Sequence, residues 1–220
     1  LDFLSQGRCF PAVGLGQEDP EEYEACGVPK EDRAQRTDEA IVLMRRLWEE
    51  ENVTHEGKFF TCHNVSITPK PFFKPSPSVW IGGRSTAAAR RVGRVGDGWL
   101  VSSATPSEVQ HGRDVMFETA EKYEREVEED HVGVLMGYYI SSEPDQAVAK
   151  AHQFVTRHRP DADFTEYSAV GTTEQVCDLI QKYIEAGGQK FVMRPLCSGE
   201  ESMEQLEIMG QEILPRFHKK

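Results

Sequence analysis

Short runs of β-branched and aromatic residues alternate with longer helical patterns over the C-terminal two-thirds of the chain. Such alternation is typical of repeated β-α units, whose strands lie parallel in a sheet. The clearest unit has a strand at 79–81, a helix at 85–95 that stops at Gly96, and a second strand that starts at Trp99. The chain must therefore fold around a parallel sheet that helices cover.

The same pattern continues toward the C-terminus. Pro106 and Pro144 each open a helix at its first turn, where a missing N–H costs nothing, and Thr172 with Gln175 fits a capping box. The other elements expected here are strands at 132–140 and 190–195, a helix at 173–186 ended by Gly187 and Gly188, and a helix at 200–214 stopped by Pro215.

The first third of the chain is less regular. Residues 9–16 are expected to form a strand that leads into a glycine-rich loop, and residues 32–51 an amphipathic helix. Residues 52–78 are rich in proline and have no helical period, which indicates an ordered insertion or a lid within a single domain at 1–220. The buried face of the helix is expected to comprise Thr37, Ala40, Ile41, Met44, Leu47 and Trp48.

The number of strands bears on the fold class. Five parallel strands are expected, near residues 9, 79, 99, 132 and 190. Five strands suit an open sheet, and they also suit the later part of an eight-unit barrel. The chain begins at Leu1 rather than at a methionine, and "LDFLSQGR" has the character of a helix tail, so we expect that an upstream portion is missing.

Composition excludes several classes of partner. A formal net charge of −12 opposes long-range attraction to nucleic acid or to anionic lipid. No apolar run is long enough for a membrane helix, and no signal peptide is recognisable, so a soluble, cytoplasmic protein is expected. The five cysteines are scattered without a C-x-x-C pair, and the histidines lack metal-ligand spacing; we expect reduced, mostly buried thiols and no metal site.

The stretch "WIGGRSTAAARR" at 80–91 is the strongest candidate for a ligand site. It leads from a strand into a helix, and ligands of parallel α/β folds gather in such loops. Gly82 and Gly83 allow backbone N–H groups to approach an oxygen, Ser85 or Thr86 adds a hydroxyl donor, and Arg84 supplies charge. The alternative interpretation is a tight turn in which Ser85 only caps the helix.

Two further glycine-containing stretches are weaker candidates. Gly14 and Gly16 in "VGLGQEDPEEYEACG" would let a flat ring or a phosphate tail lie against the backbone, with Gln17 facing inward. The stretch "GDGW" at 96–99 is also explained by an ordinary helix stop and turn. The acidic residues Glu21, Glu22 and Glu24 are expected to lie on a solvated surface.

Taken in order, several segments resemble the luciferase-like monooxygenase superfamily of flavin-dependent oxidoreductases. They include "AVGLG", "EEYEACG", "DEAIVLMRRLW", "HEGKFF", "PKPFFKPSPSVWIGG", "RRVGRVGDGW", "GTTEQVCDLIQKYIEAGG" and "ILPRF". The resemblance implies an α/β fold of the (β/α)8 TIM-barrel type, of which this chain carries strands four to eight. It also implies that FMN or the 8-hydroxy-5-deazaflavin coenzyme (F-420) binds at the carboxyl ends of the strands.

The resemblance assigns roles to particular residues. Gly82, Gly83, Arg84, Ser85 and Thr86 match the loop that holds the cofactor phosphate. The cofactor-binding set is completed by Gly14 and Gly16 beside the ring system, and by Gly98 and Trp99 near the phosphate.

The activity that the resemblance implies is that of an oxidoreductase or monooxygenase acting on a small organic substrate. No catalytic residue is identifiable, and a homodimer is left open. Two alternatives are a non-catalytic flavin-binding or degenerate barrel, and a redox-free barrel enzyme whose "GGRST" loop binds a sugar phosphate.

Overall fold

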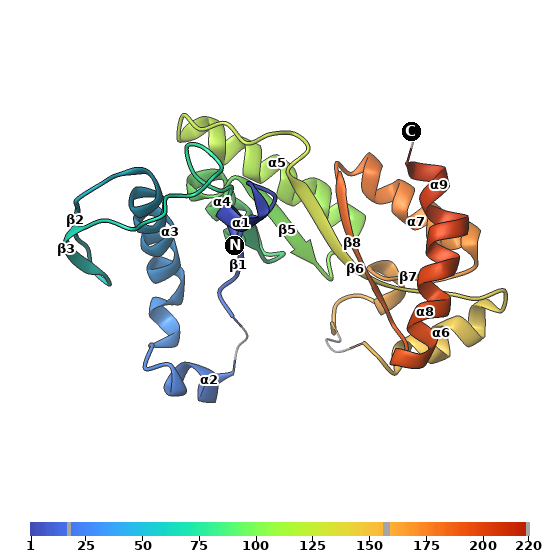
Figure 1. Cartoon of the computed structure of the whole chain (residues 1–220). Helices are drawn as coiled ribbons and strands as arrows, with labels where there is room; N and C mark the ends of the chain where they lie inside the picture. The colour runs from blue at the N-terminus through green and yellow to red at the C-terminus, as the bar shows by residue number, and fades with distance from the viewer. Residues whose placement is uncertain (17–18, 156–158, 219–220) are drawn as a thin grey trace. The chain divides into compact units, whose positions relative to one another are not determined.

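The computed structural model describes residues 1–16, 19–155 and 159–218, which form two compact units (Figure 1). The first unit comprises Leu1–Leu100 and Val115–Glu128, and the second comprises Val101–Asp114 and Glu129–Lys220. Gln17, which we expected to face inward, lies outside the described residues.

The first unit is built on parallel pairing of β1 (Ala12–Val13), β4 (Trp80–Gly82) and the start of β5 (Gly98–Ser102). Val13 pairs with Ile81, which pairs with Trp99 on the next strand. The buried core includes Trp80, Ile81, Val92 and Trp99. The helices of this unit are α1 (Asp2–Ser5), α2 (Pro20–Ala25), α3 (Arg33–Glu49, after a 3-10 turn at Lys30–Asp32), α4 (Thr86–Val95) and the later part of α5 (Pro106–Lys122).

The N-terminal elements differ from the sequence-based expectation in length and composition. The strand expected at 9–16 forms a ladder only at β1, because the glycines that follow Val13 belong to the loop. On α3 the buried residues are Ile41 and Leu43, and the rest of the expected face is half-buried. The proline-rich insertion contains an antiparallel hairpin of β2 (Val53–Glu56) and β3 (Thr61–Val65).

In the second unit β6 (Val132–Ile140) is the central strand, with β7 (Ala169–Gly171) and β8 (Lys190–Pro195) parallel to it. Tyr138 pairs with Ala169 and also with Pro195, so β7 and β8 lie on opposite sides of β6. The helices around them are α6 (Pro144–His152), a 3-10 turn at Phe164–Glu166, α7 (Thr173–Glu185), α8 (Gly199–Ile208) and α9 (Leu214–Phe217).

Most local signals of the second unit are confirmed. The strands at 132–140 and 190–195 have the expected bounds, and Thr172 and Gln175 form the capping box. Gly187 follows α7 with a φ of 96°, a conformation that favours glycine. The strand β7 was not expected from the sequence, because three residues are too short for a period to be recognised.

Two expectations were wrong. Pro215 does not stop the last helix: α8 passes into a π-helical turn at Met209–Ile213, and Pro215 then lies in the first turn of α9, where it needs no N–H acceptor. The thiols are not mostly buried, since Cys177 alone among the five cysteines is buried, and Cys9 and Cys26 are exposed. Among the described residues no helix has the length and apolar character needed to cross a membrane.

Helices α4 and α5 approach each other closely at Gly93. A Cβ atom at this position would lie 2.6 Å from the Met116 carbonyl oxygen and 2.8 Å from the Ala120 nitrogen. Backbone atoms cannot move aside cheaply, so we predict that Gly93→Ala lowers the free energy of unfolding by about 2–3 kcal/mol. Urea denaturation followed by tryptophan fluorescence measures this, because Trp48, Trp80 and Trp99 all belong to the first unit.

The matched control is Arg90→Ala, on an exposed position of the same helix. It is expected to change the free energy of unfolding by about 0.5 kcal/mol or less. Equal stability of the Gly93→Ala variant and the parent chain would contradict the close packing of these helices.

Candidate functional site

The turn between β4 and α4 has a conformation that its sequence dictates. Gly83 has a φ of 120°, and a Cβ atom there would lie 3.1 Å from the Ala88 Cβ. Ser85 caps α4: its Oγ accepts a hydrogen bond from the Ala88 N–H at 3.2 Å, and its carbonyl accepts one from the Ala89 N–H at 3.1 Å. Ser85 thus forms the helix cap that the alternative interpretation describes, and the turn has a defined geometry.

A buried tryptophan fixes the orientation of the peptide group after Gly83. The Trp99 indole Nε1 donates a hydrogen bond of 2.7 Å to the Gly83 carbonyl, and the Trp99 side chain is fully buried. The Gly83–Arg84 peptide is trans, so its N–H points opposite to its carbonyl. The Arg84 N–H therefore points away from the buried indole.

The backbone N–H groups of this turn are available to a ligand. Within the described part of the chain, no protein acceptor takes the N–H of Arg84, Ser85, Thr86 or Ala87. The N–H groups of a first helical turn lack intrahelical acceptors, and the positive end of the helix dipole lies beside them. Arg84 and Ser85 are exposed and Thr86 is half-buried. Such an arrangement suits an oxyanion.

The loop of Gly14 and Gly16 lies at the same edge of the sheet as this turn. β1 and β4 are parallel neighbours, so the loops that follow them both leave from the carboxyl ends of the strands. A Cβ atom at Gly14 would meet no atom within 4 Å, which leaves its backbone open to close approach. The structure therefore brings the two predicted glycine loops to one edge of the first unit.

Gly98 and Trp99 have supporting positions. A Cβ atom at Gly98 would lie 2.4 Å from Cε2 of Trp80, so this glycine makes room for a core side chain. Both Gly98 and Trp99 are buried at the start of β5. Direct contact of Gly98 and Trp99 with a cofactor stays a prediction. In the structure, Trp99 holds the Gly83 carbonyl in place through its indole hydrogen bond.

Asp97, inside the "GDGW" stretch, anchors the base of the same β-α unit. Its Oδ2 accepts hydrogen bonds from the Val79 N–H at 2.7 Å and from Arg45 Nη2 at 2.5 Å, and its Oδ1 accepts one from Arg125 Nη2 at 3.2 Å. One carboxylate thus joins the start of β4 to α3 and to the segment after α5. Arg45 is accordingly half-buried rather than fully exposed on α3.

Arg125 also closes the C-terminal end of α4. Its Nη1 donates to the carbonyls of Val92, Gly93 and Gly96, at 3.2, 3.2 and 2.7 Å. A cation here offsets the negative end of the helix dipole. Burial lowers the pKa of Arg125, and the neighbouring Asp97 opposes that shift. No local pattern in the sequence points to this arginine, since its partners lie about thirty positions away.

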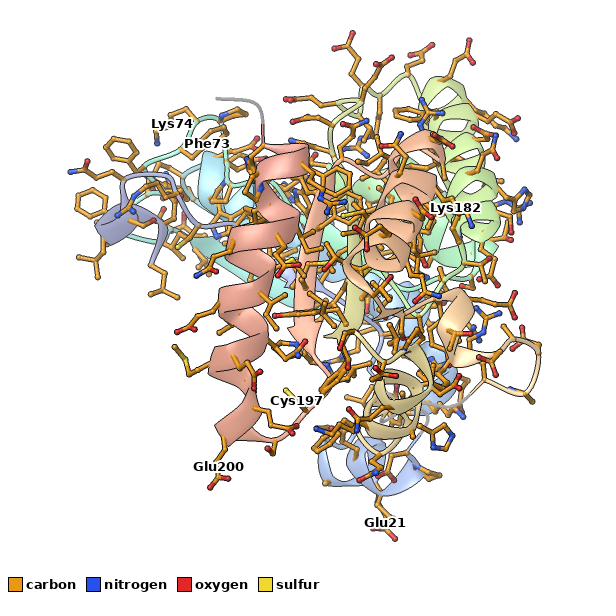
Figure 2. All side chains as sticks on the ribbon, turned by 90° about the vertical axis from the view of Figure 1, so that its right-hand side faces the viewer. Glu21, Phe73, Lys74, Lys182, Cys197 and Glu200 are labelled. Atoms are coloured by element: carbon orange, nitrogen blue, oxygen red, sulfur yellow. The ribbon has the colours of Figure 1, made fainter. Side chains whose placement is uncertain are left out.

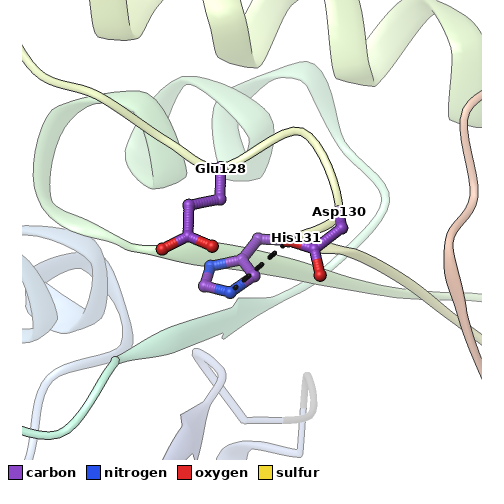
Figure 3. Close-up of side chains that lie close together, drawn as sticks. All are labelled: Glu128, Asp130 and His131. Carbon is purple, nitrogen blue, oxygen red and sulfur yellow. Dashed lines mark ion pairs between the residues drawn. The ribbon is translucent and has the colours of Figure 1, made fainter.

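Acidic residues are mostly on the surface. Glu21, Glu22 and Glu24 are exposed as expected, and Figure 2 shows Glu21 projecting outward from α2. A cluster of two carboxylates and one imidazole comprises Glu128, Asp130 and His131, whose potential ligand atoms lie within 4.8 Å of one another (Figure 3). Lys190 Nζ contacts the Asp130 carboxylate at 2.6 Å and lowers the pKa of Asp130. Because Asp130 is already paired, we assign no metal site here.

Comparison of structures supports the fold class. The chain superposes on an F420-dependent secondary alcohol dehydrogenase in complex with an F420–acetone adduct with a TM-score of 0.80, at 22% identity, over 99% of this chain and 73% of that chain. The predicted α/β fold of the TIM-barrel type is thereby confirmed. Among the described residues β1 pairs only with β4, and β8 only with β6, so the strands do not close a barrel.

Comparison of sequences then identifies the family. The model described as luciferase-like monooxygenase matches residues 1–167, and the chain belongs to this family. It is 25% identical to an F420-dependent glucose-6-phosphate dehydrogenase of Microbacterium testaceum, over 99% of this chain and 68% of that protein. It is 24% identical to an FMNH2-dependent dimethylsulfone monooxygenase of Pseudomonas fluorescens, over 98% of this chain and 66% of that protein. The predicted family is confirmed. The names of these two relatives include F420 and FMNH2, which is consistent with the predicted pair of cofactors.

Loss of the Asp97 charge should weaken the first unit. Asp97→Asn leaves Arg45 and Arg125 side by side without their shared carboxylate, and we predict a free energy of unfolding lower by about 2 kcal/mol. Urea denaturation with tryptophan fluorescence is the measurement. Asp32→Asn, which removes a surface pair with Lys58, is the control and should cost about 0.5 kcal/mol or less. Equal losses in the two variants would refute the anchoring role of Asp97.

Proposed function

We propose that this chain is the cofactor-binding part of an oxidoreductase that holds the phosphate of FMN or F420 at the turn between β4 and α4. The observation that carries the proposal is the outward direction of the Arg84 N–H, which the Trp99–Gly83 hydrogen bond enforces. The N–H groups of Thr86 and Ala87, for which no acceptor is found among the described residues, add further backbone donors at the N-terminal end of α4.

The side chains of the turn fit a phosphate as well. Arg84 supplies a positive charge on an exposed position, and the Ser85 and Thr86 hydroxyls can donate. Ser85 Oγ accepts from Ala88, and this leaves its own O–H free to donate outward. Gly82 and Gly83 carry no side chain that would block a phosphate oxygen. The donor set therefore suits a dianion better than a neutral ligand.

The bound cofactor would supply hydride or electron transfer, and the polypeptide anchors it, orients it and excludes water. In this proposal the Gly14 and Gly16 loop lies beside the ring system, because it leaves the same sheet edge as the phosphate turn. The substrate is a small organic molecule. Relatives named as dehydrogenase and as monooxygenase both occur, so the proposal covers hydride transfer and monooxygenation alike.

Comparison of FMN with riboflavin tests whether the turn between β4 and α4 binds the phosphate. Riboflavin has the same ring system and lacks the phosphate. We predict that Arg84→Gln weakens FMN binding about tenfold, the loss of roughly 1.4 kcal/mol from one charge-assisted contact, and leaves riboflavin binding unchanged. Fluorescence titration of each flavin against the chain is the measurement, and F420 is titrated in parallel.

Arg90→Gln is the matched control, because it removes the same charge from an exposed position on α4, outside the turn. It should leave both affinities within about twofold of the parent, since a solvated charge more than one helical turn away is screened. The proposal fails if neither FMN nor F420 binds at micromolar concentration, or if Arg84→Gln and Arg90→Gln weaken FMN binding equally.

A further inference from the structure

A pocket of about 310 Å³ in the first unit is lined by the Gly14–Gly16 loop, α2 and the start of α3. Pockets of this size hold small organic molecules. Its wall combines apolar groups, backbone and two guanidinium groups. The residues that line it are Gly14, Leu15, Gly16, Glu22, Tyr23, Cys26, Val28, Arg33, Arg36 and Thr37.

Within the described residues, no carboxylate pairs with the positive charge that Arg36 contributes to this pocket. Its guanidinium stacks over the Phe60 ring at 4.7 Å and near the Phe59 ring at 6.0 Å. Over the described ranges, no carboxylate or carbonyl of the protein accepts from it, although the residue is half-buried. Stacking on aromatic rings orients the planar fork and leaves its N–H groups to meet an acceptor.

Tyr23 and Arg33 give the pocket a fixed wall. The Tyr23 hydroxyl donates to the Leu15 carbonyl at 2.6 Å and accepts from Arg33 Nη1 at 3.2 Å. The Arg33 guanidinium also lies over the Tyr23 ring at 5.8 Å. Glu22 lines the pocket as well, and it is exposed to solvent.

We infer that this pocket binds the oxyanion of a small organic anion, a carboxylate or a phosphate monoester, with the oxyanion at Arg36 and the apolar body against Leu15, Cys26 and Val28. An Arg fork recognises both oxyanions in a bidentate manner. Gly14 and Gly16 line the pocket and also belong to the proposed cofactor loop. The anion is thus the substrate of the oxidoreductase, an assignment that rests on the proposed function.

Model anions test the inference on the chain as it exists. Benzoate, phenyl phosphate and the neutral benzyl alcohol are titrated by isothermal calorimetry against the parent chain and three variants. We expect benzoate or phenyl phosphate to bind, Arg36→Gln to weaken that binding about tenfold, and Arg36→Lys to restore part of it. Arg90→Gln, which makes the same charge change outside the pocket, should leave it unchanged. The stronger of the two anions identifies the substrate's oxyanion.

The outcomes separate this inference from the proposed function. FMN and F420 are titrated against Arg36→Gln, whose cofactor affinity should match the parent, and circular dichroism verifies its fold. If anions bind through Arg36 but no cofactor binds, the anion-binding role of the pocket is supported and its assignment as a substrate site is wrong. Anion affinity that is equal in Arg36→Gln and Arg90→Gln, or benzyl alcohol that binds as tightly as benzoate, would overturn the inference even if FMN binds.

Discussion

The hydrogen bond from the Trp99 indole to the Gly83 carbonyl is the interaction on which the candidate site depends. A buried donor holds the carbonyl inward, and the planar trans peptide then turns the Arg84 N–H outward. The Ser85 cap starts α4 at the next residues and aligns further N–H groups beside it. The indole hydrogen bond, the trans peptide and the Ser85 cap thus determine how the backbone N–H groups of this glycine turn are presented.

Charged side chains at the C-terminal end of α4 stabilise the β-α unit that carries the turn between β4 and α4. The Asp97 carboxylate accepts hydrogen bonds from the Val79 N–H, Arg45 and Arg125. Arg125 also donates to carbonyls at the C-terminal end of α4. These groups keep the strand and the helix of this β-α unit in register with each other. A ligand that binds at the N-terminal end of α4 therefore meets donors that need little reorganisation, which reduces the entropic cost of binding.

Local patterns predicted the parts of the fold that local interactions determine. The capping residues Ser85 and Thr172 and the long β-branched strand at 132–140 lie where the sequence indicated, because each depends on neighbouring residues. The strand β7 is too short to show a period. The prediction for Pro215 was wrong because a π-helical turn ends before it and a new helix, α9, begins there. Pairings over long sequence separations, such as Arg125 with Asp97, leave no local trace.

The candidate site was predicted in outline, and the central claim rests on the direction of its backbone donors. The most direct measurement is the change in amide chemical shifts of Arg84–Ala87 when FMN or riboflavin is added to isotope-labelled protein. The account predicts large shifts at these amides with FMN and small ones with riboflavin, since only FMN carries the phosphate. Shifts that are equal for the two flavins, or that leave these four amides unchanged on FMN binding, would contradict it.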